Sequence, residues 1–190
     1  MKLLIDFMLE AWPAAAIDRR RIGFFGFSRG GYTGLVLLGG NPDFHAGFPF
    51  CAIDSAPICK QIRDYDNSKT LAHDARIKAA VLVDPALSRL FSAPQLTGVR
   101  APIQLWSSAL GGDGVTPDGV DSIAKALPSQ PQYLIVGYAG HFSFLSPCSP
   151  EQAKAAPELC TDSPGFDRAG FHRTFNSAVL SFFRNHVGDK

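Results

Sequence analysis

The chain carries the stretch Arg21-Ile22-Gly23-Phe24-Phe25-Gly26-Phe27-Ser28-Arg29-Gly30-Gly31, in which a short apolar run leads directly into a Gly-x-Ser-x-Gly motif. A serine hydroxyl becomes a useful nucleophile only when the backbone holds it out of the fold, and a sharp strand-to-helix turn does this. Neighbouring backbone then comes so close that glycine is needed around the serine. Residues 31–38 supply the helix. We therefore predict a strand–turn–helix unit that presents Ser28; the alternative is a glycine-rich turn with an idle serine.

Further apolar runs predict the rest of the fold. Each is short, almost continuously apolar and followed by turn residues, which is typical of parallel strands buried on both faces. With the first run, the predicted strands are 21–27, 77–83, 102–106 and 132–136. Helical patterns alternate with them at 2–11, 31–38, 118–127 and 167–186. This alternation predicts an α/β fold, a mostly parallel sheet flanked by helices, in one domain over residues 1–190.

The segment of residues 41–74 interrupts this alternation. It contains Pro, Gly, Asp and two cysteines without a clear period. A loop of this length in a compact domain is usually functional or disordered. Because it follows the helix after Ser28, it could fold over the site as a cap. A surface excursion held by a disulfide is an equal alternative.

The four cysteines form two local pairs, Cys51 with Cys59 and Cys148 with Cys160. An even number in irregular segments favours disulfides formed in an oxidising compartment. Other pairings and free thiols are the alternatives. No Cys-x-x-Cys spacing occurs and no histidine flanks either pair, so we expect neither a metal site nor another cofactor.

Charge and hydropathy exclude several classes of protein. The formal net charge is +1, and the only basic cluster, residues 19–21, lies just before a predicted strand, so we expect no nucleic-acid surface. No apolar stretch reaches the length of about 18 residues that spans a membrane. Asp6 and Glu10 interrupt the apolar start, so the chain as given has no signal peptide.

Chemistry in such sheets gathers at the carboxyl ends of the strands. His141 follows the 132–136 strand after a short turn, which makes it the candidate base for Ser28. Two carboxylates compete to orient it, and both fit the chain order Ser, Asp, His. We favour Asp113, because its Gly-Gly-Asp-Gly turn leaves the carboxylate free to bend toward the base. Asp84, which ends the 77–83 strand, is the alternative.

A reaction at Ser28 also needs donors for the oxyanion. The backbone amide of Arg29, just after the serine, is one expected donor. The second donor normally comes from a loop early in the sheet. Only one predicted helix precedes the serine strand in this chain, so we expect the first strands of the complete fold to be missing.

With these motifs assembled, the chain resembles the dienelactone hydrolase branch of the α/β-hydrolases. It is most similar to bacterial predicted dienelactone hydrolases, which are related to the platelet-activating-factor acetylhydrolases. The similar stretches are residues 17–33, 76–81, 139–145, 148, 157–160 and 167–169. Members of this family have further strands and a signal peptide ahead of the part equivalent to this chain. The chain therefore resembles their carboxyl-terminal portion.

The resemblance implies that Ser28 is the nucleophile, His141 the base and Asp113 the acid, with Asp84 retained as the alternative acid. Dienelactone hydrolases proper use cysteine, so Ser28 indicates the serine-using relatives. The resemblance also implies export to the periplasm or the exterior. The predicted activity is hydrolysis of small carboxylic, lactone or acetyl esters through an acyl-enzyme. The alternatives are a catalytically dead truncated module and a peptidase of the prolyl-oligopeptidase type.

Overall fold

Four short strands pair into one parallel sheet in the computed structural model, which describes residues 1–11, 17–47, 51, 57–64 and 71–188. The strands follow each other across the sheet in the order β1-β2-β3-β4, and every pairing is parallel. Their bounds are β1 Ile22–Phe27, β2 Ile77–Val83, β3 Ile103–Ser108 and β4 Gln132–Val136. All four carboxyl ends therefore meet at one edge of the sheet.

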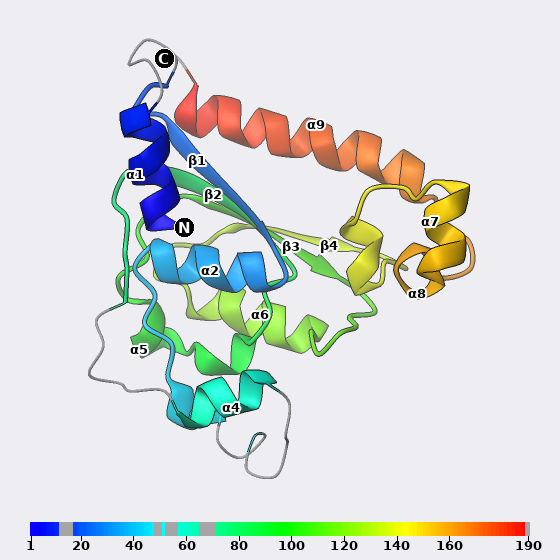
Figure 1. Cartoon of the computed structure of the whole chain (residues 1–190), viewed down its shortest axis with the longest axis horizontal. Coiled ribbons are helices and arrows are strands. Elements are labelled where there is room, and N and C mark those ends of the chain that lie inside the picture. The colour runs from blue at the N-terminus through cyan, green and yellow to red at the C-terminus, as the bar shows by residue number, and fades with distance from the viewer. Residues whose placement is uncertain (12–16, 48–50, 52–56, 65–70, 189–190) are drawn as a thin grey trace.

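Helices connect the strands and cover both faces of the sheet (Figure 1). The longer ones are α1 Lys2–Ala11, α2 Arg29–Leu37, α4 Pro57–Arg63, α6 Pro117–Ala126, α7 Pro150–Ala155 and α9 Arg168–Val187. Two are single turns, α5 Ala93–Leu96 and α8 Pro157–Cys160. The 3₁₀ turns are η1 Phe44–Gly47, η2 Ser88–Leu90 and η3 His141–Phe144. None of the helices in the described part combines the length and apolar character that a transmembrane crossing requires.

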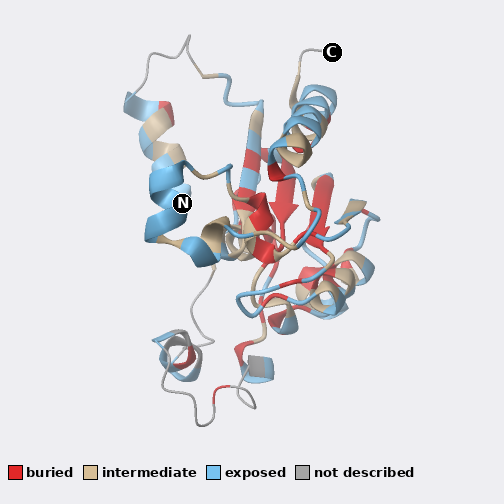
Figure 2. Cartoon of the chain, turned by 90° about the vertical axis from the view of Figure 1, so that its right-hand side faces the viewer, coloured by how far each residue is buried: buried red, intermediate tan, exposed pale blue. Residues whose placement is uncertain are grey.

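The sheet lies between two apolar layers. Helices α2 and α6 pack on one face, where Leu35 and Ile123 are fully buried in the larger core. Helix α9 covers the other face, where Phe175 and Phe182 meet alternate residues of β2 and Trp106 of β3. Figure 2 shows the buried residues gathered on the strands between these helices.

Burial within the sheet separates its centre from its edges. Strand β3 is buried throughout, and β2 is buried apart from Lys78. Strands β1 and β4 are the outer strands of the described sheet and are only partly buried, with Phe25 exposed at 48% and Ile135 at 61%. The two central strands therefore give the site its firmest support.

The structure confirms the predicted α/β fold, a parallel sheet flanked by helices. Strands 77–83 and 132–136 agree residue for residue, and the other boundaries shift by one or two residues. The short helices α4, α5, α7 and α8 were not predicted, because one or two turns show too little periodicity in the sequence.

Only part of the 41–74 segment falls within the described residues. Phe44 and the α4 residue Cys59 contribute to the core on the α2 face. Residues 48–50, 52–56 and 65–70 lie outside the described residues, so a cap formed by this segment remains a prediction.

The expected local cysteine pairing is confirmed. One disulfide joins Cys51 to Cys59 and the other joins Cys148 to Cys160. Both pairs are typical of proteins that mature in an oxidising compartment. The second pair ties the segment after η3 to the end of α8, close to the start of α9.

Two glycines allow close approaches of the backbone at the turn between β1 and α2. A Cβ on Gly26 would lie 2.3 Å from the carbonyl oxygen of Gly30, and a Cβ on Gly31 would lie 2.9 Å from Cα of Pro85. A Cβ on Gly30 would meet nothing within 4 Å. The close approach therefore depends on Gly26 and Gly31 and not on the second glycine of the motif.

We expect Gly26→Ala to lower the free energy of unfolding by about 1–3 kcal/mol, because the added methyl group would push against backbone that cannot rotate away. Gly30→Ala is the matched control. It places alanine in the first turn of α2 in open space, where it should be neutral or slightly stabilising. Urea unfolding of both variants measures the difference. Equal destabilisation by the two substitutions would contradict the close approach described here.

Candidate active site

Ser28 occupies the turn between β1 and α2. Its backbone has φ 54° and ψ −115°, a conformation that residues with a side chain rarely adopt. Its amide donates to the carbonyl of Val83 (2.9 Å) and its carbonyl accepts from the amide of Ala86 (3.0 Å). The end of β2 therefore holds Ser28 from both sides. This is the strand–turn–helix arrangement that the sequence predicts, with the serine at the carboxyl edge of the sheet.

Asp84 follows β2 directly and is completely buried. One carboxylate oxygen accepts from the amide of Ser108 at 2.7 Å. The other accepts from the hydroxyl of Ser108 at 2.5 Å and lies 3.0 Å from Nδ1 of His141. The carboxylate therefore joins the ends of β2 and β3 to the turn that follows β4.

His141 is the second buried member of this pair, with a side chain only 1% exposed. An ionised carboxylate can only accept a hydrogen bond, so Nδ1 carries the hydrogen that Asp84 receives. The neutral ring then has its lone pair at Nε2. This nitrogen is buried and has no hydrogen-bond partner among the described residues.

The ring of Phe27 packs against that of His141. It stacks on the imidazole with the ring centroids 4.5 Å apart and the planes 28° from parallel. Phe27 is the residue directly before Ser28, and it restricts the imidazole from one face. The imidazole thus stacks on the residue next to the serine, and no hydrogen bond joins Nε2 to Ser28 in this structure. Hydrogen bonds at catalytic sites often tighten only when a substrate is bound.

The structure corrects the preferred partner of His141. Asp113 lies exposed in its turn, and the hydrogen-bonded carboxylate is Asp84, the alternative. The reason is that the turn closes on itself: the amides and carbonyls of Gly112 and Val115 bond to each other. The same turn does support His141, but through backbone, because the amide of His141 donates to the carbonyl of Gly111 at 2.7 Å.

The amide of Arg29 starts helix α2. The first hydrogen bond of this helix runs from the amide of Tyr32 to the carbonyl of Ser28, so the amides before it have no partner within the helix. They lie at the positive end of the helix dipole, next to the serine. This position suits the oxyanion donor expected from the sequence. Its role and the source of a second donor remain predictions.

A small hollow of about 140 Å³ opens beside His141. Its lining includes Gly111, Gly112, Phe142 and Glu158. The larger hollow of about 580 Å³ lies at the opposite edge of the sheet, near the starts of β2 and β3, and is remote from the chemistry. Within the described ranges, no three His, Cys, Asp or Glu side chains are grouped so that they could hold a metal ion.

The sequence reasoning missed Ser108 and the stacking role of Phe27. Ser107 and Ser108 end a strand that also carries Ile103, Leu105 and Trp106 and is buried on both faces. Buried hydroxyls need partners, so two serines at the carboxyl end of such a strand were a usable signal for a buried polar group nearby. The stacking of Phe27 carried no such signal, because an aromatic residue in a strand usually packs in a core.

Comparison with known proteins gives only distant likenesses. No protein-family model and no curated protein matches the chain in sequence. Among solved structures, the carboxylesterase Cest-2923 from Lactobacillus plantarum is similar over 82% of this chain and 62% of its own, with a TM-score of 0.44 and 17% identity. A lipase/esterase from the same organism is similar over 70% of this chain and 56% of its own, at TM-score 0.39 and 17% identity.

The acylaminoacyl peptidase of Pyrococcus horikoshii is also similar, over 87% of this chain and 28% of its own, with a TM-score of 0.46 and 16% identity. This chain thus spans less than two thirds of the length of each of these proteins. None of the three is named as a dienelactone hydrolase. The likenesses are too low to assign a family.

We expect Ser108→Ala to destabilise the fold by about 1–3 kcal/mol, because the buried carboxylate of Asp84 loses one of its donors. Ser122→Ala is the control, since its hydroxyl bonds a helix carbonyl at an exposed position of α6 and should matter little. Thermal unfolding of both variants checks the prediction. It fails if the Ser108 variant is as stable as the Ser122 variant.

Proposed function

We propose that the chain is a serine hydrolase that cleaves carboxylic esters through an acyl-enzyme. Ser28 is the nucleophile, His141 the general base and Asp84 the residue that orients the imidazole. The observation that carries this proposal is the pair of Asp84 and His141: Nδ1 lies on the carboxylate, Nε2 has no partner among the described residues, and the ring stacks on Phe27, the residue before Ser28. Nucleophile, base and orienting acid form the arrangement that activates a hydroxyl.

In the proposed first half-reaction, Oγ of Ser28 attacks the ester carbonyl carbon while Nε2 of His141 takes its proton. The carbonyl oxygen becomes an oxyanion, which the amide of Arg29 stabilises. The C–O bond to the alcohol then breaks, and His141 returns the proton to the departing alcohol oxygen. Asp84 stabilises the imidazolium in between and remains ionised.

The second half-reaction repeats these steps with water. His141 takes a proton from water, whose oxygen attacks the acyl carbon on Ser28. The bond between the acyl group and Oγ breaks, and the proton passes to Ser28. The carboxylic acid leaves, and the site returns to its starting state.

A small acyl or lactone ester, as in the dienelactone hydrolase-like and acetylhydrolase-like relatives suggested by the sequence, is the proposed substrate. Two disulfides support a location outside the reducing cytoplasm, and we propose the periplasm or the exterior. Hydrolysis of p-nitrophenyl acetate, a lactone and an acyl-peptide anilide, compared side by side, separates esterase from peptidase activity.

Labelling with a fluorophosphonate tests whether Ser28 is activated. The probe should form one covalent adduct on Ser28, detected by mass spectrometry of the peptide, and Ser28→Ala should give none. Ser107→Ala should label like the wild type, because the hydroxyl of Ser107 bonds within its own strand end. An adduct that persists in the Ser28 variant would refute the assignment of the nucleophile, and a folded wild type without any adduct would refute the proposed activity.

Isosteric changes at the two aspartates test the choice of acid. Asp84→Asn should lower the rate of ester hydrolysis by about 10³-fold or more, because the amide no longer favours the imidazolium and the required tautomer. Asp113→Asn should stay within about twofold of the wild type, since it is an exposed turn residue. Initial rates with p-nitrophenyl acetate give both values. The reverse order would restore Asp113 as the acid.

A further inference from the structure

A second polar network contacts the turn that carries His141 and takes no part in the proposed reaction. Its centre is Asp162, two residues after the disulfide-bonded Cys160. One carboxylate oxygen accepts from the hydroxyl of Ser143 at 2.7 Å and from Nη2 of Arg168 at 2.9 Å. The other accepts from Nε of Arg168 at 2.8 Å. The guanidinium is bound in two places by one carboxylate, which is a strong and directional contact.

This network reaches the turn that carries His141 through one hydroxyl. Ser143 donates to Asp162, and its oxygen in turn accepts from the amide of Gly140 at 3.0 Å. Gly140 and Ser143 lie on either side of His141 in the chain, and Ser143 is 2% exposed. The hydroxyl therefore fixes the backbone on both sides of the histidine relative to Asp162.

Two further hydrogen bonds hold the turn of residues 138–144 at its ends. The hydroxyl of Ser163 donates to the carbonyl of Tyr138, and Nε2 of His172 on α9 donates to the carbonyl of Ser143 at 3.0 Å. Tyr138 has φ 59°, so the turn begins in a conformation that needs support from outside. Residues 138–144 are thus held at both ends by residues 162–172.

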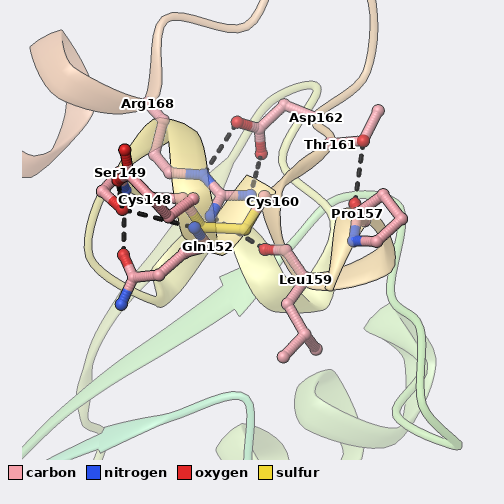
Figure 3. The surroundings of a disulfide bond; sticks show 10 residues. Cys148, Ser149, Gln152, Pro157, Leu159, Cys160, Thr161, Asp162 and Arg168 are labelled. Atoms are coloured by element: carbon pink, nitrogen blue, oxygen red, sulfur yellow. Dashed lines mark hydrogen bonds and ion pairs between the residues drawn. A yellow bond between two sulfur atoms is a disulfide. The ribbon is translucent and has the colours of Figure 1, made fainter. Parts of the chain in front are cut away.

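The Cys148–Cys160 disulfide keeps Asp162 at this place. It joins Cys148, in the segment after η3, to Cys160 at the end of α8, with a sequence separation of 12 (Figure 3). Figure 3 shows Arg168 directed to Asp162 and to the carbonyl of Leu159, which accepts from Nη1 at 2.9 Å. The disulfide and the ion pair therefore both hold the segment that ends at Asp162. Because the disulfide already restricts this segment in the unfolded chain, less conformational entropy is lost when the segment becomes ordered.

Asp162 carries its negative charge at neutral pH. Burial raises the pKa of Asp162, but the hydrogen bonds from Arg168 and Ser143 outweigh burial, and its pKa lies below the usual value. An ionised carboxylate is the stronger acceptor for the Ser143 hydroxyl. The network is therefore fully formed over the neutral pH range in which a histidine base works.

We propose that Asp162, acting through Ser143, is a positioning residue that sets the place of His141 between Asp84 and Ser28. This inference rests on the proposed hydrolase activity but concerns different residues. Asp162 touches neither the nucleophile nor the base. It acts because a misplacement of about 1 Å in a catalytic group costs about 100-fold in rate.

Two variants separate positioning from mere stability. Asp162→Asn removes the charge that binds Arg168, whereas Ser143→Ala leaves this ion pair intact and removes only the bridge to Gly140. Both should lower kcat for p-nitrophenyl acetate by about 10- to 100-fold and leave KM nearly unchanged, because the substrate does not contact them. Asp167→Asn is the matched control. It is the same chemical change at the N-cap of α9, which Asn also caps well, and should keep kcat.

Hydrogen–deuterium exchange gives a readout that does not need catalysis. Amides of residues 138–144 should exchange faster in both variants, and those in the middle of α9 should keep their wild-type protection. Wild-type exchange in residues 138–144, or an equal loss of kcat in the Asp167 control, would overturn the positioning role. A wild type that hydrolyses no ester would refute the proposed function alone, and exchange would still decide whether Asp162 holds the turn.

Discussion

The buried carboxylate of Asp84 is the interaction on which the rest of the site depends. Removing an ionised carboxylate from water costs several kcal/mol unless its lone pairs find donors. The amide and hydroxyl of Ser108 and the ring of His141 supply these donors. Asp84 follows the end of β2, Ser108 ends β3, and His141 lies in the turn after β4. Satisfying one buried charge therefore fixes three segments that are far apart in the sequence.

The turn at Ser28 is tied to the same strand end. Val83, the residue before Asp84, accepts the hydrogen bond from the amide of Ser28, and Ala86 donates to the carbonyl of Ser28. A residue with a side chain at positive φ costs on the order of 1–3 kcal/mol, and such strain persists only where the surroundings hold it. Here the surroundings are the end of β2 and the close packing at Gly26. Ser28 and Asp84 thus share one support, the end of β2.

Much of the fold and part of the site follow from the sequence, for reasons that particular residues make clear. The run Ile77–Val83 is apolar enough to identify a buried parallel strand with its bounds, and the glycines around Ser28 identify the turn. The choice between Asp84 and Asp113 could not be made in this way, because each follows a strand and both fit the chain order. The path of residues 137–141 across the sheet edge decides it, and this path depends on tertiary contacts with Gly111 and Asp162 that leave no local pattern. The sequence could have indicated Ser108, because a hydroxyl at the end of a strand buried on both faces needs a polar partner nearby.

Asp84 holds the imidazole of His141 through Nδ1 and leaves Nε2 without a partner among the described residues. The ¹⁵N chemical shifts of the two ring nitrogens of His141 in the neutral state are the sharpest test of this arrangement. The structure predicts a protonated Nδ1, with a slowly exchanging hydrogen at low field, and an unprotonated Nε2. A ring protonated at Nε2, or one whose Nδ1 hydrogen exchanges as fast as that of an exposed histidine, would contradict the account.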